Sequence, residues 1–159
     1  MELDYIISIL RTCQVFGVLS DEELKSVAEL CEVEKFKAGE TIYSQGGIGN
    51  KLYVLSEGQV SLERTIDVGD RGRATITVFT LTATPFRRLM GGWSAILGVE
   101  HIQMCSAVCY QPTTVISMEC SKLRDTINMN LAIKAKILEQ LVLVLRERID
   151  SSYKAMETL

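Results

Sequence analysis

The sequence has few of the residues on which metal centres depend. Its 159 residues include a single histidine, His101, together with two prolines, and only 6% of the residues are aromatic. One histidine cannot build a multi-histidine centre, so any metal would need carboxylate or thiolate ligands. We therefore expect no metal site, and a metal-dependent barrel enzyme of the cupin type is disfavoured.

An excess of positive charge and a long apolar run are also lacking. The formal net charge is -3 and the sequence pI is about 5.3, so direct DNA binding is not expected. The N-terminal residues carry two acids where a signal peptide carries bases, and no apolar run approaches the length of a membrane span. We expect a cytoplasmic protein without membrane contact, and its initial methionine suggests a complete short protein.

The cysteines show no paired spacing. There are five, an odd number without a CxxC motif, which argues against a disulfide framework and a zinc site. They are expected to be small buried hydrophobic residues, although a reactive thiol at Cys105 or Cys109 is a second hypothesis. The five are Cys13, Cys31, Cys105, Cys109 and Cys120.

The chain length suits one domain with one core, because 47% of the residues are apolar and 23% are charged. Residues 1–32 are expected to form N-terminal helices: a short helix at residues 4–11, and a second after the capping box that begins at Ser20. Short apolar segments separated by glycine turns predict a β-roll over residues 33–120. A longer hairpin is expected from Gln59–Ile66 and Ala74–Leu81. The predicted fold is mainly β with flanking helices, a sandwich or jelly roll.

Residues 121–159 are expected to be helical, with Ser121 as an N-cap and a long helix from about Leu131. The long helix is apolar on nearly every face, so it should be buried on more than one side. One face has the spacing of a two-helix coiled coil, which predicts a homodimer; the alternative is packing within one subunit. The predicted dimer residues are Leu138, Val142, Leu145 and Ile149.

The segment from Gly91 to Val108 has the layout of an anion-binding turn. Two adjacent glycines allow the backbone to approach a ligand closely, and the residues after them can open a short helix with free amides. The charged residues expected in such a turn are missing. Arg87 and Arg88, directly before it, are candidates for an auxiliary positive charge, although such a pair is commonly a solvated loop.

Three segments in order carry a family resemblance: residues 16–24, residues 36–42 (FKAGETI) and residues 45–60 (QGGIGNKLYVLSEGQV). They resemble, in turn, the entry helix, the first strand and turn, and the following signature of the cyclic-nucleotide-binding domain, and the resemblance covers nearly the whole chain. The resemblance implies a double-stranded β-helix with a long C-terminal helix that responds to ligand. In that family a cassette glutamate binds the ribose 2′-hydroxyl and an arginine binds the cyclic phosphate.

Here the cassette departs from the family pattern. Gly92 matches its glycine, Trp93 stands in place of the glutamate, and Gln103, or Met104 in a shifted alignment, stands in place of the arginine. Loss of the arginine should weaken phosphate binding by about one to two decades. Trp93 either plugs the sugar site or offers an aromatic face to a flat ligand. The candidate ligand-binding residues are Gly91, Gly92, Trp93, Ser94, Ala95, Gln103, Met104, Cys105 and Ser106.

Enzyme motifs are incomplete. Gly92-Trp93-Ser94-Ala95-Ile96 resembles part of a nucleophile elbow but has Ile96 where the turn needs glycine, so Ser94 is expected to be a helix cap. Residues 46–51 lack the spacing of a phosphate-binding P-loop. We therefore expect no enzyme and no resident cofactor, and a cyclic nucleotide or another small anion as an effector. The expected function is a stand-alone sensor that signals through its C-terminal helix to a partner protein; the alternative is a ligand-independent dimeric scaffold.

Overall fold

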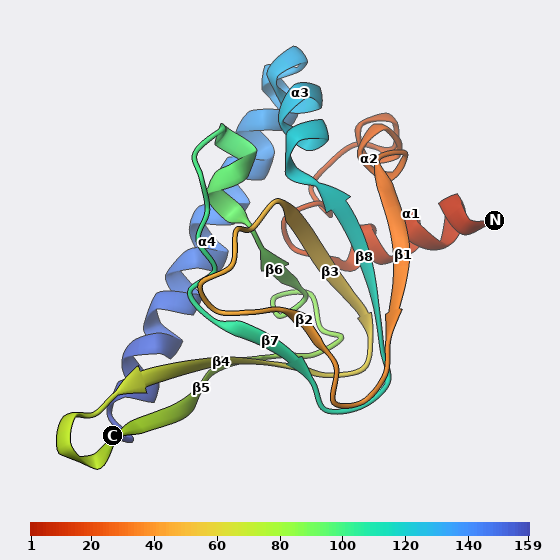
Figure 1. The fold of residues 1–159 in the computed structure, drawn as a ribbon. Helices are drawn as coiled ribbons and strands as arrows, with labels where there is room; N and C mark the ends of the chain where they lie inside the picture. The colour runs from red at the N-terminus through yellow and green to blue at the C-terminus, as the bar shows by residue number, and fades with distance from the viewer.

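The computed structural model describes residues 1–159 and contains two four-stranded antiparallel sheets with helices at both ends of the chain (Figure 1). One sheet has the order β1-β8-β3-β6 and the other the order β2-β7-β4-β5. This arrangement confirms the predicted jelly roll. The strands are β1 (Cys31–Phe36), β2 (Thr41–Tyr43), β3 (Lys51–Glu57), β4 (Val60–Asp67), β5 (Arg73–Leu81), β6 (Leu89–Gly91), β7 (Ser106–Cys109) and β8 (Thr113–Glu119).

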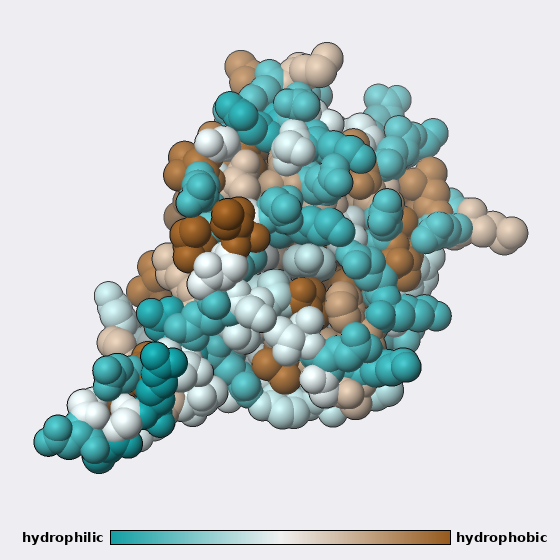
Figure 2. Space-filling model, in the orientation of Figure 1, coloured by the Kyte–Doolittle hydropathy of each residue, from teal (hydrophilic) through white to brown (hydrophobic).

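The hairpin of β4 and β5 confirms the predicted pairing of the two segments rich in Thr, Val and Ile. Its strands pair from Val60 with Leu81 to Asp67 with Arg73, and a short 3-10 turn, η1 (Gly69–Arg71), joins them. The tip extends away from the rest of the β-roll (Figure 1). It is coloured hydrophilic in Figure 2, whereas hydrophobic residues gather on the body of the molecule. The hairpin therefore contributes to the core only through its base.

Four helices flank the sheets: α1 (Glu2–Thr12), α2 (Asp21–Ala28), α3 (Cys120–Met129) and α4 (Leu131–Met156). The predicted capping box is confirmed, because the Ser20 hydroxyl accepts from the Glu23 amide and the Glu23 carboxylate accepts from the Ser20 amide. The predicted cap at Ser121 is wrong. The α3 helix begins directly from β8 at Cys120, whose amide donates to the carbonyl of Asn50, so Ser121 already lies inside the helix.

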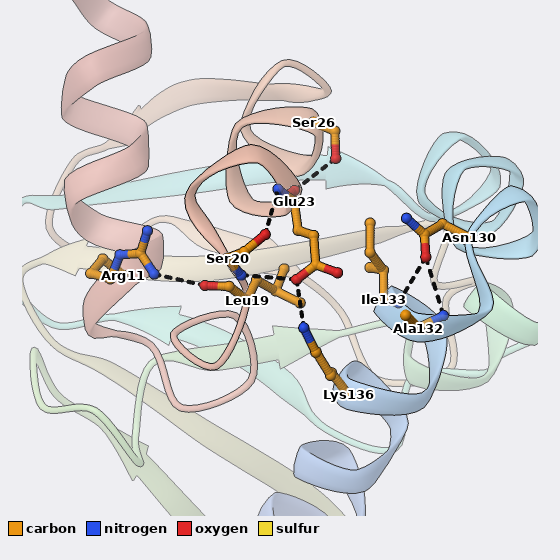
Figure 3. Close-up of polar contacts among 9 residues, drawn as sticks. All are labelled: Arg11, Leu19, Ser20, Glu23, Ser26, Asn130, Ala132, Ile133 and Lys136. Carbon is orange, nitrogen blue, oxygen red and sulfur yellow. Dashed lines mark hydrogen bonds and ion pairs between the residues drawn. The ribbon is translucent and has the colours of Figure 1, made fainter.

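The beginning of α4 is fixed to the N-terminal helices (Figure 3). The side chain of Asn130 caps α4 by accepting from the amides of Ala132 and Ile133. One turn later, the Lys136 ammonium lies 2.7 Å from the Glu23 carboxylate of α2, and this hydrogen bond lowers the pKa of Glu23. From there α4 runs past α3 toward the β4–β5 hairpin, where the C-terminus lies (Figure 1).

The core divides into two clusters. The larger one packs α1, α2, α3 and α4 against the first sheet, and the inward face of α4 contributes four buried residues to it. These are Ile133, Ile137, Leu141 and Val144, at spacings of four, four and three residues, as a helix with one buried stripe requires. The smaller cluster lies between the two sheets and includes Leu55, Val60, Leu81 and Met90.

Candidate functional site

A cavity of about 430 Å³ lies where the β-roll, the segment after β6 and the C-terminal half of α4 meet. This volume falls in the range of small-molecule sites, roughly 300–1,000 Å³. Its walls are mostly apolar and come from three parts of the chain. The lining residues are Tyr43, Leu62, Val78 and Phe79 from the strands, Gly91, Trp93, Ser94, His101, Gln103, Met104 and Cys105 from the segment after β5, and Leu145, Arg148, Ile149 and Ser152 from α4.

The two glycines of the turn are required by close backbone packing. Gly91 has φ +120°, and a Cβ atom there would lie 2.4 Å from the carbonyl oxygen of Lys51. A Cβ atom at Gly92 would lie 2.5 Å from the carbonyl oxygen of Gly49. Both distances are too short for any side chain, so the glycines let β6 and the following turn pack against the entry to β3.

The next residues form a short 3-10 helix, η2 (Trp93–Leu97). Its N-cap is Gly92, so the expectation that Ser94 caps a helix is wrong. The Ser94 amide and hydroxyl lie 3.4 and 3.0 Å from Nδ1 of His101. Burial lowers the pKa of His101, which favours the neutral ring that can accept from this amide. The amide and hydroxyl of Ser94 are therefore already engaged by the side chain of His101.

The remaining predicted site residues are divided between the cavity and the core. Gln103 is only 5% exposed, and its backbone is hydrogen bonded to Gly46 and Gly47, whereas Met104 is 70% exposed. Both line the cavity, as do Trp93 and Cys105. Ala95 and Ser106 do not: Ala95 packs against the larger core cluster, and the Ser106 hydroxyl accepts from the amide of Gln45.

The arginines before the turn lie elsewhere. Arg88 is only 8% exposed, and its guanidinium donates to the carbonyls of Leu55 and Ala83, each at 3.0 Å. Arg87 lies 3.8 Å from the Glu147 carboxylate. Neither arginine lines the cavity, although the Arg87 guanidinium carbon lies 4.7 Å from the centre of the Phe79 ring in its wall, so the auxiliary charge expected from this pair stays a prediction. Arg88 is not part of a solvated loop either, because it joins β3 to the segment after β5.

A positive charge does reach the cavity, from a residue that the sequence analysis missed. Arg148 of α4 places its guanidinium carbon 4.0 Å from the centre of the Phe79 ring and 5.4 Å from that of Trp93. Its Nη2 donates to the carbonyl of Leu89 at 2.5 Å. Burial lowers the pKa of Arg148 to about 10, so the side chain stays charged at neutral pH. Arg148 follows Leu141 by seven residues and Val144 by four, and this helical spacing predicts that it lies on the inward face of α4.

The predicted dimer residues have different surroundings. Leu138 is partly buried against the larger core cluster, and Val142 is 66% exposed. Leu145 and Ile149 line the cavity although they are 36% and 54% exposed. Part of this helix face therefore already has a role within one subunit.

The cysteines and acidic residues do not form a further site. All five cysteines are free; Cys13, Cys109 and Cys120 are buried as predicted, and Cys31 and Cys105 are partly buried. No three side chains of His, Cys, Asp or Glu are close enough together to hold a metal ion. None of the helices combines the length and apolar composition that crossing a bilayer demands.

No family model matches the chain. Over 112 residues, or 69% of this chain, the sequence is 33% identical to a cGMP-dependent protein kinase of Plasmodium berghei (strain Anka), and the chain spans 12% of the length of that kinase.

Solved structures extend the likeness over almost the whole chain. A cyclic nucleotide-binding domain from Methylobacillus flagellatus KT has a TM-score of 0.74 at 20% identity and covers 96% of this chain and 80% of its own. A cAMP-bound triple mutant of the regulatory subunit of a cAMP-independent protein kinase A from Trypanosoma brucei has a TM-score of 0.66 at 18% identity. That match covers 88% of this chain and 47% of the kinase subunit chain.

Proposed function

Because this chain has the fold of the cyclic-nucleotide-binding domains, we propose that it is a regulatory sensor module whose phosphate-binding cassette is degenerate. In this proposal a small anionic effector enters the cavity and α4 carries the signal to a partner protein. The observation that carries it is the composition of the cavity wall, because residues of the β-roll and of α4 line one and the same space. A ligand there contacts both parts and so shifts the equilibrium between positions of the helix.

The contacts of the cassette segment support its degeneracy. Trp93 lies in the cavity where the resemblance places an acid, and Gln103 is a neutral residue fixed to the Gly46–Gly47 turn. The Ser94 amide, near the beginning of the short helix after the glycines, donates to His101. In this proposal the cassette lacks the two charged groups that ordinary cyclic-nucleotide recognition uses.

Adding an arginine back tests this proposal. We expect cAMP to raise the thermal unfolding midpoint of the parent only at high concentration, and Gln103→Arg or Met104→Arg to increase the affinity by about ten- to one-hundredfold. Met104→Arg is the gentler variant because that side chain is exposed. A ligand at one hundred times its Kd adds about 2.7 kcal/mol, which a thermal-shift measurement detects readily.

The matched control is Ile102→Arg, which adds the same charge at an exposed neighbour outside the cavity lining. It should leave the response to cAMP unchanged. Tight binding of cAMP by the parent would contradict the degenerate cassette. Equal responses of all three arginine variants would show that the added charge acts without a defined site.

The second candidate function is a ligand-independent dimeric scaffold. It is favoured by the hydrogen bonds between Ser94 and His101, which occupy the expected ligand donors, and by the exposure of Val142 on α4. In either case we propose a regulatory protein rather than an enzyme, one that forms a homodimer through α4, acts without direct DNA contact and resides in the cytoplasm.

A further inference from the structure

The cavity carries one net positive charge. Its ionisable lining residues are Arg148, His101, Tyr43 and Cys105, and no carboxylate lines it. Burial raises the pKa of Tyr43 and Cys105 and lowers that of His101, so all three favour their neutral forms at pH 7. Arg148 alone is charged, and the complementary ligand for such a space is a monoanion.

The guanidinium of Arg148 has no acidic partner within the protein. Nη2 donates to the carbonyl of Leu89, Nε is buried without a hydrogen bond, and Nη1 makes none. The neighbouring carboxylate of Glu147 pairs instead with Arg87. Arg148 is partly buried in the cavity wall and pairs with no carboxylate, so its charge is available to an anion that enters the cavity.

The rest of the lining fits an apolar body. Leu62, Val78, Met104, Leu145 and Ile149 contribute hydrophobic side chains, and the rings of Phe79 and Trp93 lie against the guanidinium. We propose that the cavity binds a small organic monoanion with an apolar or aromatic body, whose acid group pairs with Arg148 of α4. This inference rests on the proposed sensor function and names its ligand class and its principal binding residue.

In this proposal the anion pairs with a different part of the chain than in the family. In the family pattern an arginine of the cassette binds the anion, whereas in this proposal the charged group comes from the C-terminal helix. A ligand whose acid group pairs with Arg148 is held directly by α4, the element proposed to transmit the signal. Ligand affinity and the position of α4 then depend on the same contact.

A pair of fluorescent probes isolates the contribution of the negative charge. 8-Anilinonaphthalene-1-sulfonate is an aromatic monoanion, and N-phenyl-1-naphthylamine is its neutral counterpart without the sulfonate. Trp93 is the only tryptophan in the chain and lies in the cavity, so energy transfer from its indole reports probes bound there. We expect the sulfonate to bind at one site and more tightly than the neutral probe.

Arg148→Gln, which removes the charge and keeps a hydrogen-bond donor, should weaken binding of the sulfonate about ten- to one-hundredfold. Binding of the neutral probe should change less than about twofold by the same charge argument. The control is Arg146→Gln, the same substitution at an exposed position of the same helix, which should change neither. Each variant is first checked for an unchanged circular dichroism spectrum.

If Arg148→Gln does not fold, Ser152→Asp keeps the arginine. Ser152 lines the cavity one turn after Arg148, and its hydroxyl donates to the Arg148 carbonyl at 2.8 Å. A carboxylate there should compete for the guanidinium and weaken the sulfonate probe without weakening the neutral one.

Taken together, the outcomes distinguish this inference from the function on which it rests. A charge-specific loss in Arg148→Gln or Ser152→Asp supports both. If both probes bind, and Arg148→Gln weakens both equally or weakens neither, the role of Arg148 is overturned. The cavity then still binds ligands. If neither probe shows energy transfer from Trp93 but cAMP still stabilises Gln103→Arg or Met104→Arg, the inference fails and the sensor function stands. If neither the probes nor cAMP bind, both fail.

Discussion

Gly91→Ala should destabilise the protein by roughly 2–4 kcal/mol, because the backbone strain and the steric clash act together. Gly91 has φ +120°, which side-chain-bearing residues rarely adopt, and the new Cβ atom would meet the Lys51 carbonyl oxygen at 2.4 Å. Relief would require β6 to separate from β3, with which Gly91 pairs opposite Leu52. The change in unfolding free energy is measured by urea denaturation.

Gly39→Ala is the matched control for this prediction. Gly39 has φ +89°, but nothing lies within 4 Å of the added Cβ atom. Its cost should therefore be the strain alone, about 1 kcal/mol. Equal destabilisation by both substitutions would show that the close contact between Gly91 and Lys51 contributes nothing, and that the paired glycines serve some purpose other than packing.

Ile137→Ala should cost about 3 kcal/mol, because this fully buried residue of α4 packs in the larger core cluster and its truncation leaves a cavity. The effect should appear as a lower urea midpoint with an unchanged slope. A loss much smaller than this would mean that α4 docks on the core less firmly than the structure shows.

Val142→Ala on the same helix provides the comparison, since Val142 is 66% exposed. Its effect on the stability of one protomer should stay within about 0.5 kcal/mol. If the proposed dimer forms through this face, the substitution should weaken it, and light scattering at several protein concentrations would show a larger monomer fraction. A large loss of stability in a monomeric protein would instead assign Val142 to the core.

The fold could be predicted from the sequence where local patterns are strong. The β4–β5 hairpin has two β-branched segments around a glycine-containing loop, and the capping box at Ser20 is a local motif; the structure confirms both. The β6 strand was missed because its three residues, Leu89–Gly91, are too few to show alternation. The expected cap at Ser121 was wrong because a strand runs directly into α3, and capping patterns describe helices that begin after a loop.

The candidate site was harder to predict because tertiary packing assembles it. Trp93, Gln103 and Met104 were found from their position after the paired glycines, and they do line the cavity. Arg148 lies more than forty residues further along the chain, beside the charged residues Arg146 and Glu147 of α4, so no local motif marks it. Only the docking of α4 brings its charge to Phe79 and Trp93.

Hydrogen exchange of the wild-type protein, with and without saturating 8-anilinonaphthalene-1-sulfonate, tests most directly whether the cavity ligand is shared by the β-roll and α4. We predict slower exchange both in the segment after β6 and in residues 145–152 of α4, because the probe contacts Trp93 and Arg148 together. Slower exchange around Trp93 with no change in α4, at full occupancy, would contradict the coupling of the ligand to the helix.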